Sequence, residues 1–587
     1  MFSTNTSPHN HTFSNHLADY AVYFLFIAIA LLFLLIFQDY GVTWDEKVQF
    51  EYGMKALRYY TSGFRDESCN HFNDLYLYGA LFELMSAAIY EYIGIAKYEI
   101  HHFLISACAL LTLVSVYKLS RLIRNSLTPF FTVVILITMP HFFGQAFFNP
   151  KDIPFACSFS WAMYAVCRLL ILEKARFQDF CLAGLAIGLA LSVRVGGLLI
   201  FILLGAGILM KLWQRRIFIA PATICVKTVI PAKAGIRYWL GCPRLTSCRG
   251  RLIKSGMTFS NIDKSIRNAS GLALLTLIAW GVMTLFWPWT HSNPFSLPFE
   301  AFRKMTAFPS VLPVLFEGRY ITSSQLPWYY LPKYFLITTP PFILIFFVIG
   351  LGVFMFHQTR NARDKKSLVI FLVELWFFFP ILYVVCRRPN IYDGIRHFLF
   401  ILPAMAIIAA AGATGMRNIL SKLVSKPWMV NVFAAAMLLQ PVADMVSLHP
   451  YQSTYYNFFV GGTRGADGRY ETDYWASSYK EGAEWINRRL TESRDKKITL
   501  VVIANDYSLD CAKYYLDSRV KIFKVWSTAD RLPLTFDYLM ATTRYLACYR
   551  FDFLPVAHVV GRQGAAFTVI RQGTGSEAHV VSKGDRM

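Results

Sequence analysis

Charged residues are scarce in this chain: they make up 16% of 587 residues, whereas soluble proteins of average composition carry roughly 25%. The deficit argues against a soluble enzyme, a disordered chain and a nucleic-acid-binding protein. The 11 cysteines include no C-x-x-C pair and are too few for a disulfide scaffold. The sequence also lacks an H-E-x-x-H motif, a P-loop and a convincing dinucleotide-binding fingerprint, so any chemistry must come from another arrangement.

The charge that is present has a strong positive bias, with 58 Lys and Arg against 36 Asp and Glu and a formal net charge of +22. A basic balance often indicates nucleic-acid binding. This chain is 55% hydrophobic with a mean hydropathy of +0.40, so basic loops on the cytoplasmic side of a membrane protein explain the bias better. We therefore predict a multi-pass protein of the cytoplasmic (inner) membrane, with membrane lipids and no nucleic acid among its partners.

Eleven apolar runs reach, or nearly reach, the length that a helix needs to cross a bilayer. They cover 21–37, 101–119, 129–143, 153–172, 180–191, 197–212, 271–288, 334–356, 368–385, 398–415 and 428–446. The first run follows a segment without Lys or Arg, so we expect a retained helix rather than a signal peptide. The fifth and sixth runs meet at 192–196 and form either a helical hairpin or one long helix.

The basic residues predict the orientation of these spans. With the N-terminus inside, the five cytoplasmic connections contain Arg121, Arg124, Lys174, Arg176, Lys211, Arg215, Arg216, Arg360, Arg363, Lys365, Lys366, Arg417, Lys422 and Lys426. The acid-rich loop 38–100 then lies outside, and an odd number of spans places the tail 447–587 outside too. This tail has ordinary polarity, an amphipathic helical pattern at 478–493 and strand patterns at 498–503, 520–526, 536–541 and 565–570, which predict a small extracytoplasmic α/β domain.

One cytoplasmic segment, 213–268, differs from the rest of the predicted transmembrane module 1–446. Its run 229–236 resembles the translated product of palindromic repeats that insert into bacterial genes. Residues 211–268 hold 12 basic residues and one acid, a net of +11 and half of the total excess. We predict an inserted segment here, and an ordinary long cytoplasmic loop is the alternative.

Three acidic residues next to predicted spans are candidate catalytic groups. Asp45 and Glu46 begin a helix after Thr43, and the T-x-x-E spacing predicts a capping box that would explain Glu46 as a purely structural residue. Asp45 can accept a proton from an acceptor hydroxyl or bind a cation. Asp152 precedes a span with Pro154 in its first turn, so it suits an N-cap, or it pairs with Asp45 across a cavity at the outer face.

Basic residues on the same face indicate an anionic ligand. Lys151 can balance the charge of Asp152 or hold a phosphate. Arg194 interrupts an apolar stretch of more than 30 residues; such a residue usually marks a functional site, although its side chain can also snorkel to lipid headgroups. The segment 387–397 breaks the positive-inside trend and contains Arg396, and arginine suits bidentate contacts with phosphate.

Aromatic side chains accompany these charges. Tyr392 and His397 flank Arg396, and Tyr329 and Tyr330 lie in an aromatic run just before a span. Tyrosine and tryptophan are common at membrane interfaces for structural reasons alone. The same side chains are suited to holding a lipid chain or the face of a sugar, so we count these four residues as candidate substrate-binding groups.

Taken in order, these features resemble the GT-C-type glycosyltransferases, specifically the dolichyl-phosphate-mannose–protein mannosyltransferase-like group, to which bacterial aminoarabinose transferases and related family 39 and 83 enzymes belong. The matching segments are 44–46 (W-D-E), Asp152, 188–194 (G-L-A-L-S-V-R), 328–332 (W-Y-Y-L-P), 394–397 (G-I-R-H) before 402–403 (L-P), and the tail motifs at 449–452, 455–457 and 470–475. Many members have Lys where this chain has Arg194. The resemblance covers nearly the whole chain except 213–268.

The resemblance implies a polytopic GT-C-like fold and an inverting glycosyltransferase. Such an enzyme moves a sugar from a polyprenyl-phosphate carrier to a lipid, glycan or protein acceptor outside the cytoplasmic membrane. It implies Asp45 as the base or acceptor-orienting carboxylate, Asp152 as an assistant or cation ligand, and Arg194 with Arg396 as stabilisers of the leaving phosphate. No cofactor is certain, because metal use varies across the superfamily and a divalent cation stays an option.

Two other hypotheses remain open at this point. The polytopic architecture and Arg194 also fit a transporter or flippase of lipid-linked sugars without covalent chemistry, although the halves of the chain show no evident internal repeat. The segment 213–268 raises the third hypothesis, an inactive relative disrupted by its insertion.

Overall fold

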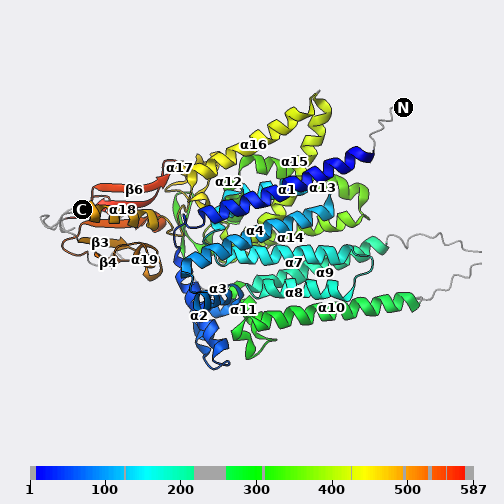
Figure 1. Ribbon diagram of the computed structural model, residues 1–587, viewed down its shortest axis with the longest axis horizontal. Helices are drawn as coiled ribbons and strands as arrows, with labels where there is room; N and C mark the ends of the chain where they lie inside the picture. The colour runs from blue at the N-terminus through cyan, green and yellow to red at the C-terminus, as the bar shows by residue number, and fades with distance from the viewer. Residues whose placement is uncertain are drawn as a thin grey trace, which may run out of the picture.

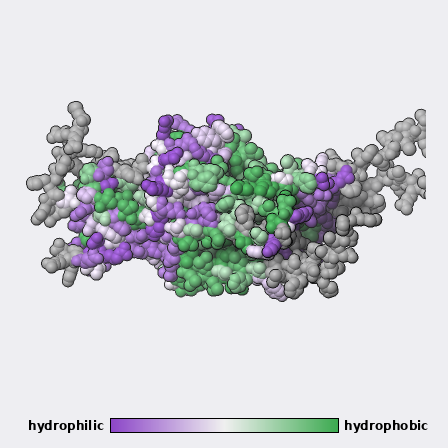
Figure 2. Space-filling model, turned by 90° about the horizontal axis from the view of Figure 1, so that it is seen from above, coloured by the Kyte–Doolittle hydropathy of each residue, from purple (hydrophilic) through white to green (hydrophobic). Residues whose placement is uncertain are grey.

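The computed structural model describes residues 8–124, 127–216, 259–306, 311–424, 426–492, 497–526, 532–549 and 551–574. Long helices lie side by side in one bundle, and a β-sheet near the C-terminus lies at one end of it (Figure 1). Apolar residues gather over the middle of the molecule, and polar residues cover much of the end that carries the sheet (Figure 2). The predicted polytopic helical membrane protein with a small C-terminal α/β domain is confirmed.

Among the described residues, seven helical segments are long and apolar enough to cross a membrane: 97–123, 152–171, 195–215, 268–285, 341–361, 365–387 and 396–423. Four shorter apolar helical segments, 20–36, 128–137, 177–191 and 436–448, account for the remaining predicted spans. The predicted count of eleven spans is therefore not confirmed. The helices of the bundle are α1 (Pro8–Ile36), α4 (Lys97–Ile123), α5 (Thr128–Ile137), α7 (Asp152–Ile171), α8 (Phe177–Leu191), α9 (Leu199–Arg216), α10 (Phe259–Leu285), α13 (Pro341–Asn361), α14 (Lys365–Arg387), α15 (Leu402–Leu423) and α16 (Pro427–Leu448).

Two predicted spans are broken by prolines. The run 129–143 is divided into α5 and a short helix α6 (Pro140–Gln145), and the run 334–356 is divided into α12 (Tyr330–Thr338) and α13. Proline has no backbone N–H and disfavours the helical conformation of the residue before it, so each helix ends just before Pro140 or Pro340. A hydropathy window does not detect these breaks because the runs stay apolar across them.

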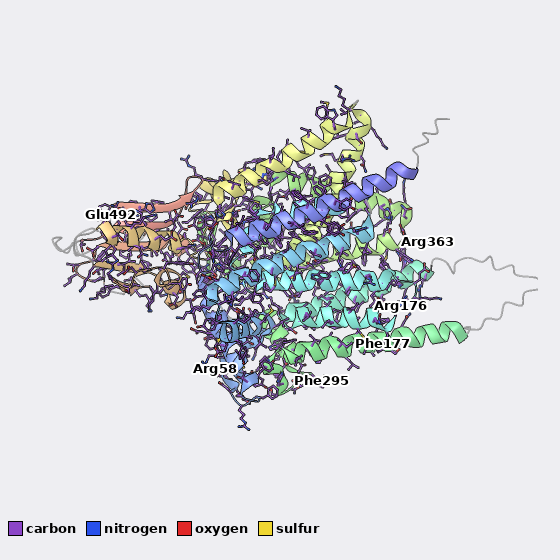
Figure 3. All side chains as sticks on the ribbon, in the orientation of Figure 1. Arg58, Arg176, Phe177, Phe295, Arg363 and Glu492 are labelled. Carbon is purple, nitrogen blue, oxygen red and sulfur yellow. The ribbon has the colours of Figure 1, made fainter. Side chains whose placement is uncertain are left out.

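The fifth and sixth predicted spans form a helical hairpin. Helix α8 begins at Phe177, which lies at the end of the bundle away from the sheet, and α9 runs back to that same end (Figures 1 and 3). Close packing against α10 fixes this hairpin, because a Cβ at Gly184 would lie 2.6 Å from the Leu275 carbonyl oxygen. The turn of the hairpin contains Arg194 and lies at the end near the sheet.

The loops predicted to be cytoplasmic and those predicted to be outside lie at opposite ends of the bundle. Arg176 and Arg363, from two predicted cytoplasmic connections, lie at one end, whereas Arg58 of the first predicted outer loop and Glu492 of the tail lie at the other (Figure 3). The predicted outer loop 38–100 and the C-terminal tail thus share one end of the bundle. Of the segment 213–268, residues 217–258 lie outside the described residues. The predicted insertion therefore stays a prediction.

The end of the bundle near the sheet is covered by short elements. Loop 38–100 contributes α2 (Trp44–Thr61) and α3 (Leu81–Ile93), and the chain after α10 contributes α11 (Leu297–Thr306) and the antiparallel pair β1 (Pro313–Phe316) and β2 (Arg319–Thr322). Loop 38–100 packs directly on the α8–α9 hairpin, since the backbone N–H of Leu81 donates to the Ser192 carbonyl at 3.2 Å. This contact brings the start of α2 and the hairpin turn into one region.

The C-terminal domain is a five-stranded mixed sheet in the order β4-β3-β5-β7-β6. Its elements are α17 (Gly462–Ala466), α18 (Tyr479–Glu492), β3 (Ile498–Ile503), α19 (Asp506–Lys513), β4 (Val520–Val525), β5 (Tyr538–Thr542), β6 (Val556–Arg562) and β7 (Ala565–Gln572). Strand β3 pairs in parallel with β4 and β5, and β7 pairs antiparallel with β5 and β6. The predicted helix and four strands are present. The sequence did not predict β6, an edge strand with one buried residue and no clean alternation.

Candidate active site

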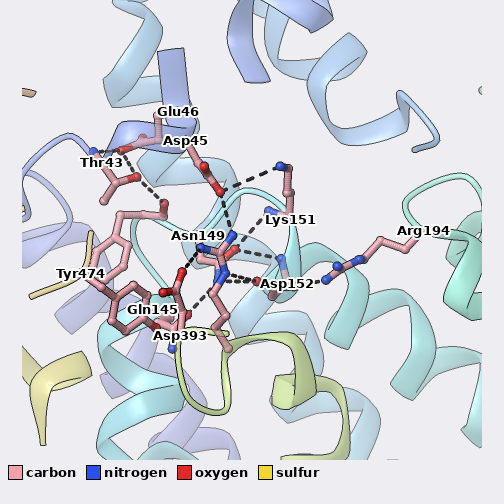
Figure 4. A network of polar contacts seen from close by, with 12 residues as sticks. Thr43, Asp45, Glu46, Gln145, Asn149, Lys151, Asp152, Arg194, Asp393 and Tyr474 are labelled. Carbon is pink, nitrogen blue, oxygen red and sulfur yellow. Dashed lines mark hydrogen bonds and ion pairs between the residues drawn. The ribbon is translucent and has the colours of Figure 1, made fainter. Parts of the chain in front are cut away.

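Arg396 lies at the centre of a buried ion network where the bundle meets the C-terminal domain. Figure 4 labels its three carboxylate partners, Asp45, Asp152 and Asp393. It belongs to a 3-10 turn, Arg396–Ile401, that leads into α15, the most buried of the candidate membrane helices. Its Nη2 donates to Asp45 Oδ2 at 2.8 Å and its Nη1 donates to Asp393 Oδ2 at 3.0 Å. Its Nε lies 3.7 Å from Asp152 Oδ2, and Trp475 covers the guanidinium plane at 4.3 Å. One guanidinium thus faces three carboxylates.

Asp45 comes to this network from the first turn of α2. Its carboxylate is 16% exposed and lies 3.9 Å from Lys151 Nζ, in addition to its bond with Arg396. Burial alone would raise the pKa of Asp45, but the positive charges of Lys151 and Arg396 outweigh burial and lower it. Asp45 is therefore ionised at neutral pH and is the most accessible carboxylate of the network.

Asp152 joins Arg194 to the same network. It is the first residue of α7, and its backbone N–H donates to Asn149 Oδ1 at 2.9 Å. Asn149 therefore satisfies the helix start, and the Asp152 carboxylate, contrary to the N-cap interpretation, is not used as the cap. Asp152 Oδ1 instead accepts from Arg194 Nη1 in the hairpin turn, and Oδ2 accepts from Asn149 Nδ2 at 2.9 Å. Asp45 and Asp152 do lie on one site, bridged by Arg396.

Two further members, Asp393 and Arg544, were missed by the sequence analysis. Asp393 accepts from Arg396 through Oδ2 and from Arg544 Nη2 through Oδ1 at 3.2 Å. Arg544 reaches the network from the C-terminal domain, where its Nη1 also donates to the Tyr474 carbonyl at 2.6 Å. Burial opposes the charge on Arg544, but the Asp393 carboxylate raises its pKa above the ordinary value. Asp393 lies within the segment 387–397 that already stood out, whereas nothing in the local sequence around Arg544 distinguishes it.

The network carries an excess of positive charge. Its members are the carboxylates Asp45, Asp152 and Asp393 and the cations Lys151, Arg194, Arg396 and Arg544. Three negative and four positive charges leave one net positive charge in a largely buried site. Such an arrangement can accept one anionic group, and arginine is well suited to phosphate.

Glu46 lies beside this network but is not connected to it. Its Oε2 accepts from the backbone N–H of Thr43 at 2.7 Å, in the predicted capping box, and its Oε1 lies 3.0 Å from His102 Nε2. The side chain is fully buried and points toward Thr43 rather than toward Lys151 (Figure 4). The capping prediction is confirmed. In this geometry Glu46 stabilises the start of α2 and does not contact the ion network.

The aromatic candidates have different surroundings. Tyr392 packs edge-on against His397, with ring centroids 4.8 Å apart, at the edge of the Arg396 network. Tyr330 is buried, and its hydroxyl accepts from the Gly394 backbone N–H at 3.0 Å, so it supports the turn that carries Asp393 and Arg396. Tyr329 lies farther out and bonds Glu317 at 3.4 Å. The structure thus brings Tyr392 and His397 to the network and places Tyr330 behind it.

A metal centre finds no support in the geometry. Within the described ranges, no group of three or more His, Cys, Asp or Glu side chains is arranged to hold a metal ion. Asp45 and Asp152, the two carboxylates considered as ligands, each face a guanidinium group instead. The net positive charge also opposes a divalent cation at this position.

One family model matches part of the chain. The family model described as dolichyl-phosphate-mannose-protein mannosyltransferase matches residues 97–232. This stretch includes Lys151, Asp152 and Arg194 of the network. Among curated proteins, no relative matches the sequence.

Among solved structures, this chain is similar to two proteins at low sequence identity. ArnT from Cupriavidus metallidurans, bound to undecaprenyl phosphate, is 13% identical with a TM-score of 0.44, and the alignment covers 94% of this chain and 98% of ArnT. The oligosaccharyltransferase AglB from Archaeoglobus fulgidus is 10% identical with a TM-score of 0.43, and the alignment covers 89% of this chain and 70% of AglB. At TM-scores this low the likeness carries no argument about the reaction.

The family match covers residues 97–232, and its described parts, 97–124 and 127–216, lie in the helical bundle and contain Lys151, Asp152 and Arg194 of the network. It confirms the resemblance that the order of motifs in the sequence predicts: this chain is a multi-pass membrane protein similar to the dolichyl-phosphate-mannose–protein mannosyltransferases.

Proposed function

We propose that this protein is a glycosyltransferase that moves a sugar from a polyprenyl-phosphate carrier to an acceptor hydroxyl at the outer face of the cytoplasmic membrane. The observation that carries the proposal is the buried network around Arg396, which combines one net positive charge with a partly accessible carboxylate. Its place supports the proposal too, because it lies at the end of an apolar bundle that a polyprenyl chain can follow.

The donor phosphate is best accommodated by the cations of the network. Arg194 and Lys151 flank Asp152 and Asp45, and Arg396 Nε is buried without a hydrogen-bond partner among the described residues. A buried donor without a partner costs free energy, so an entering phosphate oxygen would gain a bond that the free protein lacks. Binding of the phosphate also draws positive charge away from Asp45.

Asp45 then acts as the base or as the carboxylate that orients the acceptor. In the free protein Lys151 and Arg396 lower the pKa of Asp45, and a carboxylate with a low pKa is a weak base. When the donor phosphate shares these cations, the pKa of Asp45 rises and the carboxylate becomes a better proton acceptor. The network thus couples donor binding to the activation of the acceptor.

The reaction that fits these roles is a single inverting displacement. The acceptor oxygen attacks the anomeric carbon and gives its proton to Asp45, while the bond from that carbon to the phosphate oxygen breaks and its electron pair stays with the phosphate. Charge grows on the leaving phosphate, and Arg396 and Arg194 are positioned to stabilise it. Asp152 and Asp393 hold these two guanidinium groups in place.

In this proposal the transmembrane module 1–446 binds the lipid-linked donor, and the domain 447–587 closes the site from outside. Arg544 of the domain reaches Asp393 at 3.2 Å and so extends the network across the boundary between the two parts. The acceptor is a lipid, a glycan or a protein, and the sugar is a hexose or a pentose.

The test is turnover of undecaprenyl phosphates that carry different hexoses or pentoses, with the purified protein in nanodiscs. Wild-type protein should release free undecaprenyl phosphate, and Asp45→Asn should lower the rate at least 100-fold. Glu51→Gln, an exposed acid on the same helix, is the matched control and should behave as wild type. Movement of an intact lipid-linked sugar across the bilayer of proteoliposomes, without cleavage, would establish a flippase instead.

A further inference from the structure

A buried glutamine lies next to Lys151, the lysine of the ion network. Gln49 is 2% exposed and comes one helical turn after Asp45 on α2, so the two side chains share a face of this helix. The amide of Gln49 faces Lys151 Nζ on one side and the carboxylate of Glu83 on the other. The reaction proposed above gives no role to Gln49 or to Glu83.

The two neighbours of Gln49 determine how its amide is oriented. An ammonium group only donates hydrogen bonds, whereas the carboxylate of Glu83 can accept them. The amide oxygen therefore faces Lys151 and accepts from Nζ at 2.5 Å, and the amide nitrogen faces Glu83 and donates to Oε1 at 3.2 Å. In this orientation Gln49 joins the ammonium of Lys151 to the carboxylate of Glu83.

Glu83 is itself held in place by its surroundings. It belongs to the first turn of α3 and is 4% exposed, and its Oε2 lies 3.3 Å from Nε2 of the buried His101 on α4. Helices α2 and α3 pack closely at this point, because a Cβ at Gly53, one turn after Gln49, would lie 2.3 Å from the Glu83 carbonyl oxygen. Glu83 therefore fixes the amide of Gln49, and this amide offers Lys151 an acceptor at a fixed position.

The distances around Lys151 Nζ indicate what this acceptor does. Nζ lies 2.5 Å from the Gln49 oxygen but 3.9 Å from Asp45 Oδ2, which exceeds the length of about 2.7–2.9 Å that a charge-assisted hydrogen bond has. A lysine side chain is flexible, so a movement of about 1 Å would give Nζ a direct bond with Asp45. Gln49 thus holds the ammonium near Asp45 without a hydrogen bond between the two charges.

We propose that Gln49, held by Glu83, is a positioning residue for Lys151 that directs the ammonium toward the donor phosphate and prevents it from bonding Asp45. The inference rests on the proposed transferase function and deepens it, because it explains how Lys151 can bind phosphate while Asp45 stays free to accept the proton of the acceptor hydroxyl. Without the Gln49 amide, Lys151 turns to Asp45, so the phosphate loses one cation and the base is occupied.

The test is a double-mutant cycle of Gln49→Leu with Lys151→Met, read first as binding of undecaprenyl phosphate. Native mass spectrometry of the full-length protein measures this binding without any catalysis. Gln49→Leu should weaken it roughly tenfold, as expected when a charged group loses a hydrogen bond that positions it. In the Lys151→Met background, Gln49→Leu should change the affinity by no more than about twofold, because no ammonium remains to be positioned.

Turnover of a lipid-linked sugar provides the second measurement. Gln49→Leu should lower kcat and raise KM for the donor, whereas partial misfolding would lower the amount of active enzyme and leave KM unchanged. Gln49→Met, which is close to glutamine in length, should show the same losses. Gln358→Leu is the matched control, because Gln358 of α13 also donates to a carboxylate, Glu374 Oε2 at 2.8 Å, but outside the network. This control should behave as wild type.

The outcomes separate this inference from the proposed function. If both Gln49 variants bind undecaprenyl phosphate and turn over the donor as wild type does, the inference is overturned and the transferase stands. If Gln49→Leu weakens binding by the same factor with and without the Lys151 ammonium, Gln49 does not act through Lys151 and the inference is overturned as well. If binding shows the expected coupling but no donor is turned over, the transferase fails and the positioning of Lys151 for phosphate remains.

Discussion

Arg396→Lys tests the role that we assign to the Arg396 guanidinium, because lysine keeps the positive charge but cannot make the same set of hydrogen bonds. Arg396 uses Nη2 for Asp45 at 2.8 Å, Nη1 for Asp393 at 3.0 Å and Nε toward Asp152 at 3.7 Å. A lysine has one nitrogen on a flexible stem and cannot reach three carboxylates that surround a planar group. At least one of the two short bonds is lost.

Two magnitudes follow from this geometry. A hydrogen bond to a charged group contributes about 1.5–3 kcal/mol to stability, so the free energy of unfolding should fall by about that amount. Loss of one donor that stabilises charge in a transition state costs about 10²–10³ in rate, and we expect a loss of that size in kcat. The rate should fall while the affinity for the lipid-linked donor changes much less, because the positive charge remains.

The assay is release of undecaprenyl phosphate from a lipid-linked sugar under single-turnover conditions, with donor affinity measured separately. Arg387→Lys is the matched control, because Arg387 lies in the same segment and is exposed to solvent. Turnover by Arg396→Lys within threefold of this control would refute the assignment, since a site organised by a planar guanidinium cannot tolerate the change.

Two further predictions concern stability. Burial raises the pKa of Glu471 to about 7 from an ordinary value of 4.5, so its charged form is penalised in the folded protein. Below pH 4.5 the carboxyl group is protonated in both the folded and the unfolded state. As the pH rises from 4.5 to 7 the unfolded state loses its proton first, so the free energy of unfolding should fall by about 3 kcal/mol. Glu471→Gln should remove this dependence, as measured by chemical unfolding from pH 4 to pH 8. Glu46→Ala should lower the free energy of unfolding by about 1–3 kcal/mol, because the buried N–H of Thr43 loses its acceptor at 2.7 Å.

Each of these stability predictions has its own comparison. A pH profile of Glu471→Gln that keeps the slope of the wild type between pH 4.5 and 7 would assign the dependence to other groups. For Glu46, the variant Glu46→Gln retains an oxygen acceptor for Thr43 and should lose much less stability than Glu46→Ala. Equal losses in the two variants would mean that the capping bond contributes little.

Local patterns in the sequence predict much of the fold. Apolar runs locate the helices of the bundle, and alternation locates four of the five strands of the C-terminal sheet. Pro140 and Pro340 also indicate helix breaks in the sequence, but a hydropathy window averages over the apolar residues on both sides of each proline. The edge strand β6 was not predicted, because only one of its seven residues is buried and its residues show no alternating burial.

The candidate site was only partly predictable. Asp45, Lys151, Asp152, Arg194 and Arg396 stand out as charges at the ends of apolar runs, and the structure brings all five together. Glu46 has the same sequence surroundings as Asp45, yet its side chain turns to the backbone of Thr43 because one residue along a helix rotates the side chain by about 100°. The sequence pattern does not show which of these two side chains points toward Arg396, because it does not place Arg396 relative to the helix.

The sequence by itself determined the class of this protein. Scarce charge, long apolar runs and basic loops specify a polytopic membrane protein, because hydrophobicity and charge act over a few residues at a time. Only the tertiary structure decided which charges meet. Arg396 bonds a carboxylate 351 positions away, and Arg544 bonds one 151 positions away, and both pairs exist because the packing of separate elements encloses them. Buried charges need partners, and the fold supplies those partners from whichever segment lies near.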